Sequence, residues 1–170
     1  GTEAGRYGGA GILAGLAFLA RGEGALLLPA LMIFLPAGKR LRGAGALIAG
    51  FALPVIAWSL YAWPTFGAIL PHTLAVKLAQ GHAAPWAERF PAGLWRDMVD
   101  TWGAHLWASV PALRWAVWPV ALSGGALLLR ARAWRIFGLW ILLHALAYSA
   151  MGLPAYCYWY RFPEYWIWLA

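Results

Sequence analysis

Long apolar segments alternate with short polar ones along the chain, and this pattern predicts membrane-spanning helices. A helix that crosses a bilayer needs about 20 apolar residues, each adding about 1.5 Å. Three segments approach that length, two shorter ones precede them, and another apolar run lies at the end of the sequence. The predicted spans are residues 8–20, 25–36, 43–63, 111–129, 136–152 and 164–170. We therefore expect an all-α, polytopic transmembrane helix bundle with short broken helices, forming a single domain over residues 1–170.

The first two apolar segments are too short to cross a bilayer as separate straight helices. Residues 8–20 reach only about 20 Å as a helix, whereas the hydrocarbon core is about 30 Å thick. The string Arg21-Gly22-Glu23-Gly24 separates the two segments, which predicts a broken, re-entrant hairpin. Its two charges either face a protein interior or a watery cavity, or are hydrated at the membrane surface. Three glycines have a spacing that would let the first segment approach another helix closely: Gly8, Gly11 and Gly15.

A long polar and proline-containing stretch, residues 64–110, is predicted to be an outer loop. Within it, residues 87–106 carry apolar side chains at helical spacing, which indicates an amphipathic helix lying in the membrane interface. The apolar positions are Phe90, Leu94, Trp95, Met98, Trp102 and Leu106. The charged positions that we expect to face water are Glu88, Arg89, Arg96, Asp97 and Asp100.

Composition supports a membrane protein. The chain is 63% apolar and 11% charged, whereas soluble domains are about 45–50% apolar and about 25% charged. The net charge of +7 does not indicate nucleic-acid binding, because the basic residues lie in short loops between spans rather than on one face of a soluble domain. Such loops mark the cytoplasmic side, so we expect residues 39–42 and 130–135 inside, in a multi-pass protein of a bacterial inner membrane. The single cysteine, Cys157, excludes an intramolecular disulfide framework.

Polar residues near the expected outer face have two interpretations each. Lys77 is a point charge suited to phosphate, and His72 could move a proton near neutral pH. The alternative, which the residue types alone favour, is a helix N-terminus capped by Thr73 and followed by a snorkelling lysine. Tyr158, Tyr160 and Arg161 could stack on a sugar and pair with a phosphate, or they could anchor the chain at the interface.

Other polar residues give weaker signals. His144 lies in an apolar segment, where a hydrogen bond to another helix is the expected role. Asp97 and Asp100 are expected to be solvated, although an outer carboxylate could also hold a divalent cation or act as a base. No P-loop, G-x-S-x-G, H-E-x-x-H or dinucleotide-binding motif occurs in the sequence. The residues therefore identify no cofactor, and a divalent cation stays open.

Three strings resemble segments of GT-C-type membrane glycosyltransferases. Residues 14–24 are similar to the "aGLa-x-L-x-R-P-[DE]-G" segment of that family, with Gly22 where proline is usual. Residues 67–77, with Pro71-His72-Thr73 and Lys77, resemble its "G-x-x-x-P-[NHQ]-T-x-x-x-K" segment. Tyr158-Trp159-Tyr160, followed by Pro163, is similar to its "W-Y-[YF]" loop. The order of the three strings agrees with the family across nearly the whole chain.

The resemblance implies a membrane enzyme that takes a sugar from a polyprenyl-phosphate donor and transfers it to an acceptor at the extracytoplasmic face. By the same resemblance, the donor or acceptor cavity is lined by Arg21, Glu23, His72, Lys77, Tyr158 and Tyr160. Arg161 is a further candidate for that cavity, as a cation for the leaving phosphate. The family's essential acidic residue lies in an early outer loop, so we expect this chain to be a fragment that lacks the general base.

Two other classes stay open at this point. A transporter or flippase component also has broken helices and charges within the membrane, and a non-catalytic membrane scaffold would carry scattered outer polar residues. The identity of the sugar and of its acceptor, the length of the lipid and the oligomeric state do not follow from the sequence.

Overall fold

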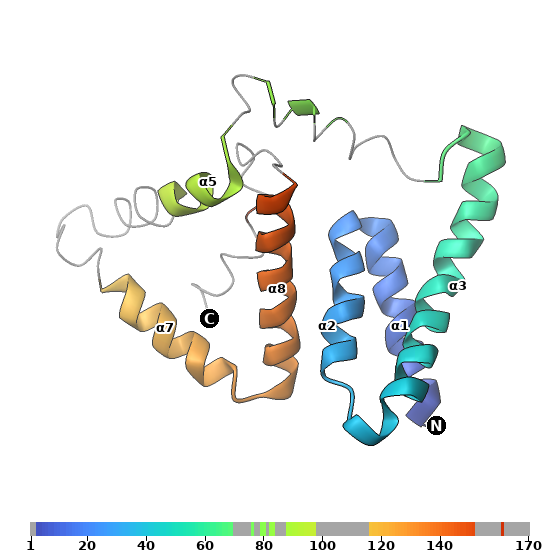
Figure 1. The fold of residues 1–170 in the computed structure, drawn as a ribbon, viewed down its shortest axis with the longest axis horizontal. Helices are drawn as coiled ribbons and strands as arrows, with labels where there is room; N and C mark the ends of the chain where they lie inside the picture. The colour runs from blue at the N-terminus through green and yellow to red at the C-terminus, as the bar shows by residue number, and fades with distance from the viewer. Residues whose placement is uncertain are drawn as a thin grey trace. The chain divides into compact units, whose positions relative to one another are not determined.

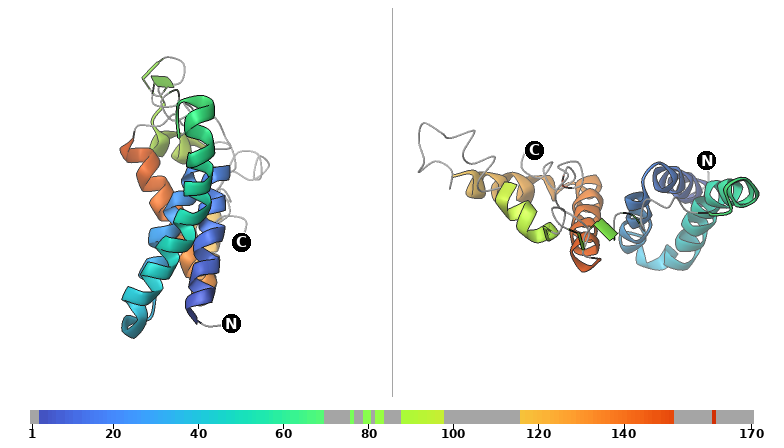
Figure 2. Two further views of the ribbon diagram at one scale, coloured as in Figure 1. Left: turned by 90° about the vertical axis from the view of Figure 1, so that its right-hand side faces the viewer. Right: turned by 90° about the horizontal axis from the view of Figure 1, so that it is seen from above.

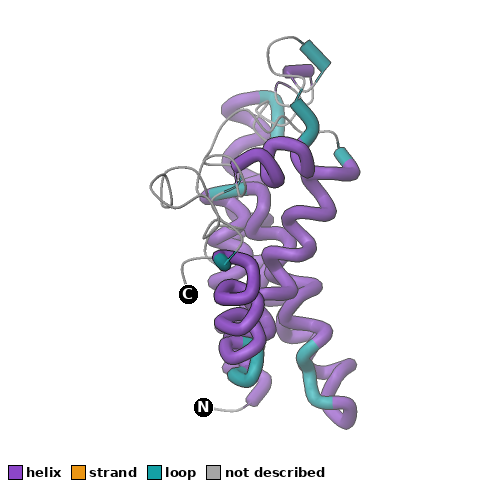
Figure 3. Tube along the Cα trace, turned by 90° about the vertical axis from the view of Figure 1, so that its left-hand side faces the viewer, coloured by secondary structure: helices purple, strands orange, loops and turns teal. Residues whose placement is uncertain are grey.

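The computed structural model describes residues 3–69, 76, 79–80, 82–83, 88–97, 116–151 and 161 of the chain. Every regular element within these ranges is helical, as Figures 1 and 3 show, which confirms the all-α prediction. The chain divides into two compact units, Gly1–Pro71 and His72–Ala170. The predicted segment 164–170 lies outside the described ranges.

Unit 1 consists of three helices that run up, down and up (Figure 1). The elements in chain order are α1 (Glu3–Ala20), the 3-10 turn η1 (Gly22–Leu26), α2 (Leu27–Ile33), the 3-10 turn η2 (Ala37–Lys39) and α3 (Arg40–Phe66). The helical hairpin predicted around Arg21 is present, because the extended backbone of Arg21 (φ −149°, ψ 129°) ends α1. The first helix of this hairpin is longer than the predicted apolar segment, residues 8–20. Helix α1 begins at Glu3 rather than Gly8, and its 18 residues span about 27 Å.

Helices α1 and α3 pack side by side through glycines (Figures 1 and 2). A Cβ atom added at Gly15 would lie 2.6 Å from the carbonyl oxygen of Phe51, and one added at Gly11 would lie 2.9 Å from the Phe51 nitrogen. Gly50 of α3 makes the same kind of close contact from the other helix, since a Cβ added there would overlap the carbonyl oxygen of Gly8. The prediction that the glycines of the first segment permit close helix approach is confirmed, and this packing is typical of helices in membranes.

Helix α3 is 27 residues long and extends beyond the predicted span at both ends. It ends at Gly67, which adopts a left-handed conformation (φ 69°) and donates its backbone N–H to the carbonyl of Trp63 at 3.0 Å. Such a glycine is a common helix terminator, because a side chain is strained at positive φ. The first glycine of the string at residues 67–77 therefore has a structural role.

Unit 2 contains three described helices, α5 (Phe90–Arg96), α7 (Val117–Leu128) and α8 (Arg132–Ala150). Helix α5 packs on α8 near the C-terminal end of α8 (Figure 1). The turn between α7 and α8 is closed by Arg135, whose Nε and Nη2 donate to the carbonyls of Leu129 and Arg130 at 2.8 and 3.0 Å. These carbonyls have no partner within the helix that they end, so the basic residue also has a local structural function.

Two helical segments of the described residues are long and apolar enough to cross a membrane, Ala37–Phe66 and Arg132–Ala150. Large apolar side chains remain exposed on both, among them Leu53, Leu60, Leu142 and Leu146. A surface of this kind is typical of helices that face lipid.

Candidate functional site

Arg21 and Glu23 form an ion pair at the turn between α1 and η1. Arg21 Nε lies 3.4 Å from Glu23 Oε2. The Arg21 side chain is 55% exposed, whereas that of Glu23 is 11% exposed. Gly24 brings the turn against α1, since a Cβ there would lie 2.6 Å from the carbonyl oxygen of Ala17. The turn is thus packed on its inner side and presents a guanidinium on its outer side.

The opposite end of unit 1 carries a second ion pair, between Lys39 and Glu3. Lys39 Nζ lies 2.5 Å from Glu3 Oε2, and both side chains are exposed. This pair brings the start of α1 to the same end as the basic residues that open α3 (Figure 1). Within the described residues of unit 1, these two ion pairs therefore lie at opposite ends.

The Lys39–Glu3 contact predicts a specific pH dependence. The hydrogen bond from Lys39, and then its charge, lower the pKa of the Glu3 carboxyl below the ordinary 4.5. A lowered folded-state pKa stabilises the fold above the unfolded-state value, and the stabilisation is lost as the pH falls through the folded-state value. We expect Lys39→Gln to lower the denaturation midpoint slightly at pH 7 and to have no effect at pH about 2, well below the carboxyl pKa range. An equal effect at both pH values would contradict this role.

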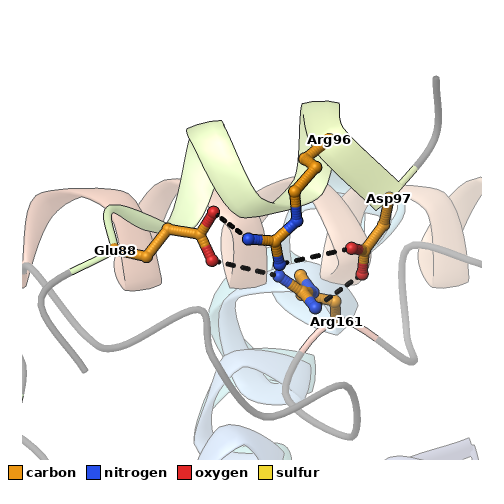
Figure 4. Close-up of polar contacts among 4 residues, drawn as sticks. All are labelled: Glu88, Arg96, Asp97 and Arg161. Atoms are coloured by element: carbon orange, nitrogen blue, oxygen red, sulfur yellow. Dashed lines mark hydrogen bonds and ion pairs between the residues drawn. The ribbon is translucent and has the colours of Figure 1, made fainter. Parts of the chain in front are cut away.

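Four charged residues of unit 2 form what we call the ion-pair cluster: Glu88, Arg96, Asp97 and Arg161 (Figure 4). Arg161 Nη2 lies 2.6 Å from Asp97 Oδ2, and its Nη1 lies 3.9 Å from Glu88 Oε2. Arg96 Nη1 donates to Glu88 Oε1 at 2.5 Å, and its Nη2 lies 3.5 Å from Asp97 Oδ1. Each carboxylate thus faces both guanidinium groups.

The exposure of the cluster is uneven. Arg161 and Asp97 are buried, Glu88 is partly buried and Arg96 is exposed. Burial by itself lowers the pKa of Arg96, but the carboxylates of Glu88 and Asp97 outweigh it and raise that pKa above its ordinary value. Arg96 therefore stays charged at any physiological pH.

The burial of Asp97 corrects the expectation that this carboxylate faces water, since its side chain is only 1% exposed. Asp97 lies seven residues after Phe90, which places it on the face of α5 that packs on α8. Trp95, expected on the apolar face, is 57% exposed, because it lies on the opposite side of the helix. The remainder of the predicted interfacial helix, residues 98–106, lies outside the described ranges.

His144 lies in an aromatic cluster where α5 meets α8. Its ring centroid is 4.3 Å from that of Tyr148, 5.9 Å from that of Trp140 and 5.9 Å from that of Phe90. The side chain is fully buried. From another helix, the ring of Phe90 contacts it, and the predicted hydrogen bond of His144 to another helix stays a prediction.

The seven candidate cavity residues fall into three groups. Arg21 and Glu23 are paired in unit 1, and Arg161 is buried in the ion-pair cluster of unit 2. The other four, His72, Lys77, Tyr158 and Tyr160, lie outside the described residues. Within the described ranges, no group of three His, Cys, Asp or Glu side chains could hold a metal ion.

No protein-family model, curated protein or solved structure matches the chain.

Proposed function

We propose that the chain is part of a GT-C-type membrane glycosyltransferase. It would transfer a sugar from a polyprenyl-phosphate donor to an acceptor at the extracytoplasmic face of a bacterial inner membrane. The observation that carries the proposal is the Arg21–Glu23 ion pair, at the turn of a helical hairpin and at the opposite end of unit 1 from Lys39. Arg21 and Glu23 are the arginine and the acidic residue of the string at residues 14–24 that resembles the family's segment.

The chemistry of sugar transfer from a phosphate explains why an arginine suits this position. The leaving phosphate gains negative charge, which fixed cations stabilise, and the acceptor hydroxyl needs a base. Arg21 has an exposed guanidinium held by Glu23, so it is already oriented before a phosphate arrives. Lys77 is another candidate for this cation in the proposal.

A transporter or flippase component is the second candidate, favoured by the helix break at Arg21. Broken helices with charges at the break are typical of transporter substrate sites. The two candidates differ in their products, because a flippase moves the lipid-linked sugar and leaves its phosphate bond intact. Formation of free polyprenyl phosphate together with a glycosylated acceptor identifies the transferase.

Lys77→Ala in the full-length protein tests the proposal. We expect sugar transfer from a polyprenyl-phosphate donor to fall by about 100-fold or more, which is the usual cost of removing a group that stabilises developing charge. Membrane insertion, measured by resistance to carbonate extraction, should be unchanged. Lys77→Arg, which keeps the charge, is the matched control and should retain much more activity.

Two outcomes would count against the proposal. If Lys77→Ala reduces transfer and insertion equally, Lys77 has a structural role. If the wild-type full-length protein moves polyprenyl-phosphate sugars across vesicles without releasing polyprenyl phosphate, the transporter interpretation replaces the transferase.

A further inference from the structure

The end of unit 1 where α1 begins and α3 begins carries a group of cations, which we call the basic surface (Figure 1). Its members are exposed: Arg6, Lys39, Arg40 and Arg42. Lys39 contacts Glu3. The pKa of the Glu3 carboxyl is lowered first by Lys39 and then by the charge of Arg6, so Arg6 lies close enough to act on the same ion pair. Four cations thus accompany one carboxylate among these described residues.

Arg40 and Arg42 have charges that no described carboxylate neutralises. Within the described ranges, neither guanidinium forms an ion pair, because Glu3 is paired with Lys39. An arginine keeps its charge at any physiological pH, and its planar group can donate two parallel hydrogen bonds to a phosphate. Both side chains are therefore available to a phosphate outside the chain.

Leu41 stands between these two arginines and is 89% exposed. A leucine on its own in water loses the stabilisation that burial would give it. At the boundary between lipid headgroups and acyl chains, however, a leucine beside basic residues is favoured, because the cations bind the headgroups while the apolar side chain enters the acyl layer. The exposed leucine thus distinguishes a lipid surface from a soluble anion as the partner.

The length of α3 places the basic surface at the depth of the headgroups. The apolar part of α3, residues 43–63, is about 30 Å long as a helix, which matches the thickness of the hydrocarbon core. When this part spans the core, Arg40, Leu41 and Arg42 lie within about 5 Å of its edge. The sequence predicts this edge on the cytoplasmic side, where the leaflet carries anionic lipids.

We propose that the basic surface binds the phosphate groups of anionic phospholipids, through Arg40 and Arg42, and that Leu41 enters the acyl layer between them. This contact would hold the first turn of α3 at the membrane surface. The proposal does not depend on the proposed function, because its ligand is a membrane phospholipid and because Arg21 lies at the opposite end of unit 1.

Photoreactive phospholipids test the proposal. The full-length protein is reconstituted in phosphatidylcholine vesicles that contain a trace of phosphatidylglycerol or of phosphatidylcholine, each with a photoreactive group in its headgroup. The label on the peptide that covers residues 37–43 is measured by mass spectrometry. We expect the phosphatidylglycerol probe to label this peptide at least about tenfold more than the phosphatidylcholine probe, since one basic residue near an anionic surface contributes about fivefold.

Charge variants locate the effect. Arg40→Gln/Arg42→Gln should lower the ratio of the two labels at least about fivefold, whereas Arg40→Lys/Arg42→Lys, which keeps the charge, should retain most of it. Arg130→Gln/Arg132→Gln is the matched control, because it removes two exposed arginines at the turn between α7 and α8, and it should leave the ratio at residues 37–43 unchanged. An equal loss in this control would overturn the assignment to the basic surface.

Leu41→Ala keeps every charge of the basic surface. It should lower the phosphatidylglycerol label about threefold or more, because contact with the acyl chains is lost. An unchanged label would overturn the insertion of Leu41.

The wild-type protein alone decides the proposal if the charge variants do not insert into membranes. Equal label from the two probes would overturn it. So would a label that excess polyprenyl phosphate removes and excess phosphatidylglycerol does not, because the surface would then bind the donor lipid. A protein that shows the expected ratio but transfers no sugar contradicts the proposed function only, and one that transfers sugar with equal labels contradicts this proposal only.

Discussion

Replacing Gly11 with leucine is expected to separate α1 from α3. A Cβ at this position would overlap the carbonyl oxygen of Leu47 and lie 2.9 Å from the backbone nitrogen of Phe51. Both obstacles are backbone atoms of a neighbouring helix, so no side chain can turn aside to make room. We expect a loss of about 3 kcal/mol in the free energy of unfolding, the upper part of the range for overpacked interiors.

The matched control for this substitution is Gly9→Leu on the same helix. No atom lies within 4 Å of a Cβ at Gly9, and leucine favours the helix over glycine by roughly 0.5–1 kcal/mol. Unfolding in mixed micelles of increasing SDS content, followed by helical circular dichroism, should therefore show a lower midpoint for Gly11→Leu and an equal or higher one for Gly9→Leu. Equal midpoints for the two variants would mean that α1 and α3 do not pack through this contact.

Replacing Phe90 with alanine is expected to release α5 from α8. The Phe90 ring is buried between Tyr148 and His144, and Leu94 and Ala145 pack against this cluster. Loss of a buried phenylalanine costs about 3–5 kcal/mol, through lost burial and the cavity that remains. Because α5 also carries Arg96 and is followed directly by Asp97, the ion-pair cluster should loosen together with the helix.

Hydrogen–deuterium exchange of peptides covering residues 88–97 measures this release. The exchange of α5 amides should accelerate in Phe90→Ala and remain near wild type in Trp95→Ala, because Trp95 is a larger ring on the same helix but is mostly exposed. The same acceleration in both variants would show that α5 is held by something other than the Phe90 contact.

Local patterns predicted the parts of unit 1 that depend on neighbours in sequence. The turn at Arg21 follows from a charged and glycine-rich string between apolar segments, and Gly11 and Gly15 follow from their spacing on one helix face. The hydropathy pattern did not predict that α1 begins at Glu3. The ion-pair partner of Glu3 is Lys39, which lies 36 residues away in the chain. Hydropathy describes only the apolar part of a helix, so it ends the segment where polar residues begin.

The ion-pair cluster shows where inference from the sequence stops. Asp97 lies seven residues after Phe90, on the buried face of α5, but the sequence analysis placed it in water, because an isolated buried carboxylate is strongly unfavourable. Its partner Arg161 is far along the chain and beyond another helical pair, so no local pattern connects them. A charge on the apolar face of a short helix is the signal that could have prompted a search for an opposite charge elsewhere.

The central claim is the proposal that Arg21 contributes to a site that binds a polyprenyl phosphate. A polyprenyl phosphate with a photoreactive group beside the phosphate tests it most directly, in membranes that contain the full-length protein, with labelled residues mapped by mass spectrometry. We predict label on the segment around Arg21, and its loss when unlabelled polyprenyl-phosphate sugar, but not polyprenol, is added in excess. Label confined to the apolar surfaces of α3 and α8, or unaffected by the competing phosphate, would contradict the claim.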